Sequence, residues 1–113
     1  MQRRLELDEE DRRQFVRFDI NLPIKFFDIT NNRIGVAKSH DICAKGIGFT
    51  TDTNLNKGTE LEIWLDVPDG QRPIYTKGNV VWSMIISQDL YRVGVYLEKV
   101  DFLDISRILR IGH

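Results

Sequence analysis

The sequence reads Glu60-Leu-Glu-Ile-Trp-Leu-Asp-Val67 near its middle, and this stretch gives the clearest indication of the fold. An apolar residue occupies every second position from Leu61 to Val67, with charged side chains and Trp64 between them. Such an alternation is typical of a β-strand with one buried face, because successive side chains of a strand point to opposite sides. Pro68-Asp-Gly70 follows as a strong turn signal, so the strand is expected to end there.

Similar alternation on both sides of this stretch predicts five further strands. They are expected to run through residues 18–26, 34–40, 47–49, 73–86 and 91–97. Pro23 cannot donate a ladder hydrogen bond, so the first strand is expected to lie at a sheet edge or to carry a bulge. Gly78 predicts a bend or bulge in the fifth strand. Asn31-Asn32 and the region Ser87-Gln-Asp89 are predicted turns. Several short strands without helices between them favour an antiparallel barrel or sandwich over a parallel α/β sheet.

The two ends of the chain differ from the strand region. Residues 1–14 are dense in charge and poor in apolar side chains, which predicts a flexible N-terminal arm. Near the C-terminus, apolar residues recur at helical spacing after the candidate cap Asp101, and Arg107 and Arg110 follow. These apolar residues are Phe102, Ile105, Ile108 and Leu109. We therefore expect a helix over about 100–111, packed across a single domain that spans 12–113.

Composition narrows the class of function. Sixteen basic and 17 acidic residues give a net charge of −1, which argues against binding long nucleic acid through a broad basic surface. A net charge near zero is compatible with a small anionic ligand that binds in a local basic cleft. Cys43 is the single cysteine, so an intramolecular disulfide is excluded. The sequence has no signal peptide and no apolar run near the ~20 residues of a membrane helix, which predicts a cytoplasmic protein without membrane insertion.

Two segments carry the candidate ligand-binding residues. The first is Arg12-Arg13-Gln-Phe-Val-Arg17, and the second is Asp41-Ile-Cys-Ala-Lys-Gly46. Guanidinium groups present planar forks of donors that bind phosphate oxygens bidentately. The Asp41 carboxylate can accept two hydrogen bonds from the Watson–Crick edge of guanine, which adenine cannot offer. Gly46 and Gly48 let a planar base approach the backbone. Together these residues indicate a receptor for a phosphorylated purine.

Each of these residues also has a simpler interpretation. The arginines are compatible with a solvated arm in which Glu9 pairs with Arg13 at i,i+4 spacing. Asp41 is compatible with a strand-end carboxylate satisfied by backbone amides, and Cys43 with a small buried side chain.

No arrangement of residues in the sequence indicates catalysis or metal binding. A zinc site needs about four ligands, and the histidines are limited to His40 and the terminal His113. Ser39-His40-Asp41 cannot form a triad as adjacent strand residues, because neighbours point to opposite faces. No phosphate-binding loop of the Walker type is present. We therefore expect a protein that is not an enzyme and has no cofactor or metal.

The aromatic residues offer a different function, a stacking platform for single-stranded nucleic acid. They are Trp64, Tyr75, Trp82, Tyr91 and Tyr96. The near-neutral charge weakens this alternative, and most of these side chains are expected to fill or flank the core.

With both ligand segments placed, the chain resembles the PilZ domain, a bacterial receptor module for cyclic di-GMP. That family has an Arg-x-x-x-Arg arm followed by Asp or Asn-x-Ser-x-x-Gly, and this chain has Arg13 and Arg17, then Asp41 and Gly46. The resemblance extends from about Arg12 to Leu97. It includes Gly78-Asn-Val-Val-Trp82 and Arg92-Val-Gly-Val-Tyr-Leu97, which look like late strands of that fold.

The resemblance implies a six-stranded antiparallel β-barrel of the split-barrel or Greek-key type, with a C-terminal α-helix. It also implies that Arg13 and Arg17 grip the phosphates and guanine faces, Asp41 contacts a guanine edge, and Gly46 allows close approach. Arg12 would stack on a base or favour an intercalated ligand dimer. Cys43 replaces the usual serine, and the lost hydrogen bond is expected to cost about 1 kcal/mol, roughly five-fold in affinity.

The leading hypothesis is thus a non-catalytic cyclic di-GMP receptor in which binding orders the arm and alters the interaction with a protein partner. Regulation of motility or biofilm formation is the expected process. The alternative is a PilZ-like adaptor in motility, pilus or envelope machinery that does not bind the nucleotide. The partner's identity, and the choice between monomer and homodimer, stay open.

Overall fold

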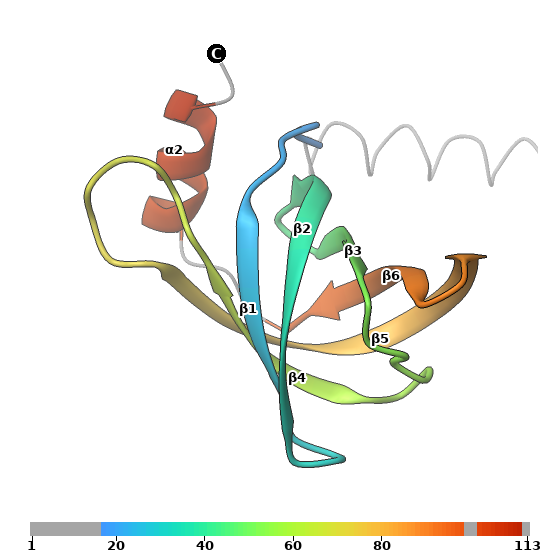
Figure 1. The fold of residues 1–113 in the computed structure, drawn as a ribbon. Helices are drawn as coiled ribbons and strands as arrows, with labels where there is room; N and C mark the ends of the chain where they lie inside the picture. The colour runs from blue at the N-terminus through green and yellow to red at the C-terminus, as the bar shows by residue number, and fades with distance from the viewer. Residues whose placement is uncertain (1–16, 99–101, 112–113) are drawn as a thin grey trace, which may run out of the picture.

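A computed structural model describes residues 17–98 and 102–111, and the described residues form six strands and one helix. The elements are β1 (Pro23–Asp28), β2 (Arg33–Cys43), β3 (Gly46–Thr51), β4 (Glu60–Leu65), β5 (Ile74–Ser87), β6 (Leu90–Leu97) and α2 (Phe102–Ile111). All strand pairs are antiparallel, and the sheet closes in the order β1-β2-β3-β6-β5-β4 (Figure 1). This closed barrel with a C-terminal helix confirms the predicted fold class.

The connections follow the turn signals of the sequence. Asn32 and Asp89 have positive φ angles of 54° and 58°, and they close the β1–β2 and β5–β6 hairpins. Residues with short polar side chains tolerate this left-handed conformation better than most. The connection from β3 to β4 crosses between strands that are not neighbours. As a result β2 and β5 lie three places apart in the ring, on opposite sides of the barrel.

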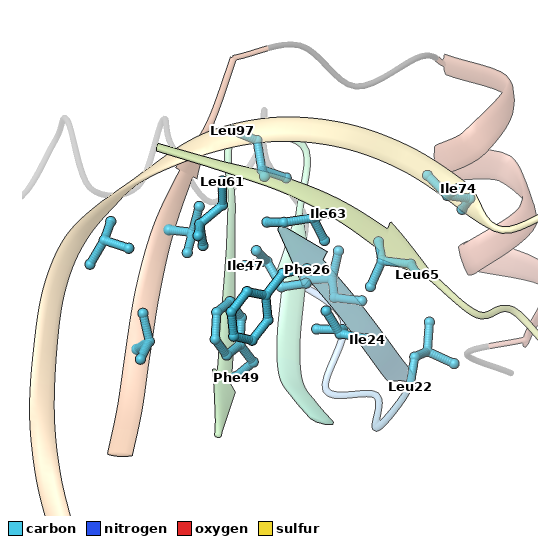
Figure 2. Close-up of a cluster of buried hydrophobic side chains, with 14 of the residues drawn as sticks. Leu22, Ile24, Phe26, Ile47, Phe49, Leu61, Ile63, Leu65, Ile74 and Leu97 are labelled. Carbon is cyan, nitrogen blue, oxygen red and sulfur yellow. The ribbon is translucent and has the colours of Figure 1, made fainter. Parts of the chain in front are cut away.

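Apolar side chains from the strands fill the barrel, as Figure 2 shows. The rings of Phe26 and Phe49 stack in the core with their centroids 5.9 Å apart. Gly35 lies opposite Phe26 on β2, and a Cβ at this glycine would lie 2.2 Å from the Phe26 ring. The glycine therefore makes room for the aromatic ring. Ile108 of α2 is fully buried in the same cluster, so the helix extends the core beyond the sheet.

A bidentate ion pair fastens α2 to the loop between β4 and β5. Arg107 donates from Nε to Asp69 Oδ2 at 2.7 Å and from Nη2 to Asp69 Oδ1 at 2.9 Å. Its Nη2 also donates to the backbone oxygen of Arg72 at 2.7 Å. The hydrogen bonds from Arg107 lower the pKa of Asp69 to about 2. The helix and this loop lie side by side in Figure 1.

Two predictions about the strands are wrong. The first strand begins at Pro23 instead of residue 18, and the preceding segment makes one isolated bridge, Phe18 with Ile42. Pro23 needs neither an edge nor a bulge, because a missing N–H does not interrupt the ladder at the first position of a strand. The bulge predicted for the fifth strand is present, but the register of β5 shifts at Val81 and Ile86, while Gly78 stays in register at a close approach of β6, where a Cβ would lie 2.5 Å from the Tyr96 oxygen.

The helix begins and ends close to the predicted bounds, but one residue of its predicted apolar face is misplaced. Leu109 is 42% exposed, whereas Ile111 packs against the core. The predicted arm over 1–14 and the candidate cap Asp101 lie outside the described residues, so they stay predictions, as does the domain boundary at residue 12.

Candidate functional site

The chain before β1 is held against β2 at two points. Ser39 Oγ accepts a hydrogen bond from Leu22 N at 2.7 Å and donates one to the Ile20 oxygen at 2.6 Å. Phe18 and Ile42 exchange two backbone hydrogen bonds, of 2.7 and 2.9 Å. These contacts determine where the first predicted ligand segment enters the barrel surface.

Between the two anchor points, β2 carries an irregularity that turns Asp41 outward. The register with β3 shifts between Ser39 and Asp41. Residues two apart on a regular strand share a face, but Ser39 is buried and Asp41 faces the outer surface. The extra residue, His40, contacts Thr50 through its ring Nε2.

Arg17 and Asp41 form an ion pair, with Arg17 Nε 3.2 Å from Asp41 Oδ2. The Arg17 side chain is 71% exposed and that of Asp41 is 28% exposed. Most of the guanidinium is therefore open to solvent and to a ligand. The two segments that the sequence marked as ligand-binding meet at this pair.

A single row of residues across four strands forms the floor beside this pair. In the strand register, Asp41 of β2 lies opposite Gly48 of β3, Gly48 opposite Gly94 of β6, and Gly94 opposite Trp82 of β5. The two central positions carry no side chain. The middle of the row therefore has room for side chains that reach in from its two ends.

The two end residues lean over the glycines. A Cβ at Gly48 would lie 2.4 Å from Asp41 Oδ1, and one at Gly94 would lie 2.2 Å from Trp82 Nε1. Real Cβ atoms do not make such close contacts, so the carboxylate and the indole lie where they do because both positions are glycine. The row presents a carboxylate at one end and an aromatic ring at the other.

This row lies within a cavity of about 370 Å³ on the outer face of β2, β3, β6 and β5. The cavity is lined by Arg17, Asp41, Cys43, Gly46, Ile47, Gly48, Val81, Trp82, Met84, Arg92, Gly94 and Val95. Its volume falls in the range of about 300–1,000 Å³ that is usual for small-molecule sites. Two guanidiniums and one carboxylate make the lining suited to an anionic ligand with a hydrogen-bonding edge.

The structure brings together four of the six predicted site residues. Arg17, Asp41, Cys43 and Gly46 all line the cavity, whereas Arg12 and Arg13 lie outside the described residues. Sequence reasoning did not assign Arg92, Gly94 or Met84 to the site. Strand alternation places Arg92 and Gly94 on one face, so the run Arg92-Val-Gly94 carried a signal for both.

The aromatic residues do not form one platform. Trp64 and Tyr75 form a tilted ring pair at 5.4 Å on β4 and β5, while Trp82 covers Gly94 in the cavity. Tyr91 packs against the core, and Tyr96 lies beside Lys45. This arrangement gives no continuous path for successive stacked bases.

Residues 17–98 and 102–111 contain neither of two further classes of site. In these ranges, His, Cys, Asp and Glu side chains form no group of three or more that could hold a metal ion. No helix there combines the length and apolar character that crossing a bilayer requires.

Residues 11–111 match the protein family described as the PilZ domain. Comparison with curated protein sequences gives no match. Among solved structures, the Bacillus subtilis inhibitor of motility MotI/DgrA has a TM-score of 0.70 at 20% identity, over 89% of this chain and 49% of that one. The chain thus spans about half the length of that protein.

Two other similar structures contain c-di-GMP. The PilZ domain of YcgR from Escherichia coli, with c-di-GMP, has a TM-score of 0.65 at 14% identity, over 86% of this chain and 88% of that one. The MrkH–c-di-GMP complex of K. pneumonia has a TM-score of 0.62 at 18% identity, over 88% of this chain and 49% of that one. At these identities the similarity establishes a shared fold.

Proposed function

This chain belongs to the PilZ domain family, and we propose that it is a non-catalytic receptor that binds cyclic di-GMP in the cavity on its outer face. The match over residues 11–111 confirms the family predicted from the two ligand segments. The observation that carries the proposal is the row Asp41, Gly48, Gly94 and Trp82, with Arg17 paired to Asp41 at its end.

The row suits a guanine base. Gly48 and Gly94 make room for the two groups that would meet the base, the Asp41 carboxylate over Gly48 and the Trp82 indole over Gly94. Asp41 accepts hydrogen bonds from the N1 and N2 donors of the guanine edge. Trp82 contributes an aromatic surface for stacking, an interaction worth about 1–3 kcal/mol per base in other nucleic-acid sites.

The cations of the cavity suit the phosphates. Arg17 and Arg92 both line it, and guanidinium forks bind phosphate oxygens bidentately. Arg12 and Arg13 precede this position in the sequence and, by the family pattern, add further donors. Gly46 leaves room beside β6, where a Cβ would lie 3.1 Å from the Val95 oxygen. Cys43 contributes a weak thiol donor at the position of the family's serine.

Binding in this cavity alters the surface that the protein offers to a partner. Arg17 lies just before the Phe18–Ile42 bridge, and its side chain is exposed, so a bound phosphate draws this residue and those before it onto the barrel. The reordered segment and the nucleotide then form one new surface. Similar structures include a motility inhibitor and a YcgR domain with c-di-GMP, which supports a role in motility control. Bacterial cytoplasmic signalling, with biofilm formation as the other process, is part of the proposal.

Isothermal titration calorimetry with cyclic di-GMP tests the proposal. We expect saturable heat with the wild-type protein, and at least ~10-fold weaker binding for Arg17→Ala because a charge-assisted phosphate contact is lost. Arg110→Ala is the matched control, since Arg110 is an exposed arginine on α2 and should leave the affinity unchanged. Absence of heat from folded wild-type protein, at ligand concentrations up to high micromolar, contradicts the proposal.

The second candidate function is an adaptor that uses the same fold only as a docking surface for protein. Cys43 favours it, because a thiol lines the cavity where the family has a serine hydroxyl. Cys43→Ser separates the two functions. Heat from the variant alone means that the cysteine disables a nucleotide site, whereas no heat from either protein leaves the adaptor as the better account.

A further inference from the structure

The outer half of β5, residues 81–87, differs from every other strand segment in its exposure. Every side chain from Val81 to Ser87 is exposed, and five of them are large and apolar. These are Val81, Trp82, Met84, Ile85 and Ile86, with exposures between 43% and 73%. In Figure 1 this part of β5 leads into the hairpin turn with β6, away from α2.

One edge of this segment is open. β4 pairs with β5 only as far as Asn79, and Gly58 and Thr59 add backbone hydrogen bonds to Val80. Beyond that point β5 pairs with β6 on one side. Among the described residues, no strand pairs with its other edge from Val81 to Ser87. Unpaired backbone donors and acceptors on an edge form a template for another strand.

A groove of about 500 Å³ runs along this open segment. It is lined by Asn54, Asn56, Lys57, Val81, Trp82, Ser83, Ile85 and Tyr91. One side of the groove is the loop after β3, and the other is the β5–β6 hairpin, with Val81, Trp82, Ser83 and Ile85 of β5 and Tyr91 of β6. The groove therefore extends over the β5–β6 hairpin beside the open edge.

The segment lacks the charged residues and prolines that normally block edge pairing, and it carries two register shifts against β6, at Val81 and Ile86. Native edges carry Lys, Glu or Pro that oppose pairing with a second chain. The ten residues from Asn79 to Gln88 include no charged residue and no proline. Two identical edges would place like charges opposite each other if the edge were charged. This edge carries no charge, so two copies can pair without that repulsion.

The exposed apolar area supplies part of what an interface needs. The five exposed apolar side chains leave on the order of 500 Å², comparable to the largest patch on a typical monomer. A standard interface buries roughly 800 Å² on each partner. The loop residues Asn54, Asn56 and Lys57 line the same groove and supply further area for contact.

From these observations we propose that two copies of this chain associate through the open edges of β5, paired antiparallel about Met84. The open edge is seven residues long, and Met84 is its centre, so full overlap places Val81 of one copy opposite Ser87 of the other. Antiparallel pairing of two identical edges is self-complementary under a two-fold axis. The product is a continuous sheet across two barrels.

Charge complementarity supports this register. Lys57 lines the groove next to Gly58, which is hydrogen-bonded to Val80 at the inner end of the open edge. Asp89 lies in the turn at the outer end of the same strand. In the antiparallel arrangement the outer end of one copy meets the inner end of the other. Asp89 of each copy then comes level with Lys57 of the other, and both contacts join opposite charges.

Sedimentation equilibrium of the full chain without ligand tests the proposal. We expect a reversible dimer over the micromolar range, and Ile85→Lys should raise its dissociation constant by about ten-fold or more. Ile85 is 73% exposed, so the substitution leaves the fold intact, which circular dichroism verifies. Ile34→Lys is the matched control, because Ile34 is 79% exposed on β2, on the opposite side of the ring.

A charge pair tests the register itself. Pairing about Met84 places Ile85 of one copy opposite Ser83 of the other, so Ser83→Glu combined with Ile85→Lys should restore the dimer that Ile85→Lys weakens. Three results overturn the proposal: a monomeric wild-type protein throughout the micromolar range, equal weakening by Ile34→Lys, or no restoration by the double variant. A monomer would direct attention to a strand from a different protein as the occupant of the groove.

Discussion

A glycine beneath an aromatic ring occurs both inside the barrel and on its outer face across β2, β3, β6 and β5, but with different consequences in the two places. Inside, Gly35 makes room for the ring of Phe26, which is fully buried and fills the core. Outside, Gly94 makes room for the indole of Trp82, which is 43% exposed and borders a cavity. A glycine beneath an aromatic ring thus stabilises the fold in one place and shapes a binding surface in the other. We therefore expect substitutions to separate stability from binding.

The largest effect is expected inside the barrel, from Phe26→Ala. Truncating a buried aromatic side chain removes apolar contacts and leaves a cavity, at a cost of about 3–5 kcal/mol in the free energy of unfolding. Urea denaturation followed by Trp fluorescence measures this cost. Binding of cyclic di-GMP per folded molecule should stay at the wild-type value, since Phe26 does not line the cavity. A loss of less than ~1 kcal/mol in the free energy of unfolding would mean that Phe26 contributes little to the stability of the core.

A matched pair of glycine substitutions makes the comparison sharper. In Gly94→Ala the new Cβ displaces the Trp82 indole, which can move into solvent, so nucleotide affinity should fall about ten-fold while stability changes little. In Gly35→Ala the new Cβ meets a ring enclosed by the core, so stability should fall by about 1–3 kcal/mol with affinity unchanged. Calorimetry measures the nucleotide affinity of both variants, and urea denaturation measures their free energies of unfolding. Equal loss of affinity in the two variants contradicts the expectation.

A smaller effect on stability is expected from the clamp between α2 and the β4–β5 loop. The pKa of Asp69, held at about 2 by Arg107, lies below the ordinary value of 3.8. The clamp therefore contributes fully above pH 4, and its contribution is lost as the pH falls through 2. Asp69→Asn should lower the melting temperature by a few degrees at pH 7, and the difference from wild type should shrink between pH 4 and 2. A difference that is the same at every pH would mean that the carboxylate charge is not responsible.

The smallest effect is expected within the cavity, from Cys43→Ser. A hydroxyl is a better donor than a thiol, so affinity for cyclic di-GMP should be equal or up to about five-fold tighter. The change in stability should stay within about 0.5 kcal/mol, because Cys43 is only partly buried. Weaker binding by the serine variant would show that the sulfur itself contacts the ligand favourably.

Much of the barrel follows from local patterns in the sequence. Alternation from Leu61 to Val67 predicts a half-buried strand, and Leu61, Ile63 and Leu65 are indeed buried in β4. Turn residues such as Asn32 act through their own backbone preferences, so they are readable without tertiary information. Val67 is also buried, although it lies beyond the end of β4. A side chain is buried when it packs against the core, whereas a residue belongs to a strand only where a neighbouring strand pairs with it.

The candidate site was predictable only in part, because its shape depends on contacts between strands. The motif residues Arg17 and Asp41 were found from their spacing, and the structure pairs them. The bulge that turns Asp41 outward is not visible in the alternation of β2. The row that joins Gly48 to Gly94 and Trp82 depends on the register of three strands, which no local pattern determines.

Val81 and Trp82 line both the ligand cavity and the groove beside the open edge, so a two-residue stretch of one strand forms a common wall. Under the two proposals made above, the nucleotide and the second copy both contact this common wall, so their binding is thermodynamically linked. If the nucleotide changes the dimer dissociation constant by some factor, dimerisation changes the nucleotide dissociation constant by the same factor. This holds whether the effect is strengthening or weakening. Such a protein can convert a change in second-messenger concentration into a change of assembly state without any hinge or separate domain.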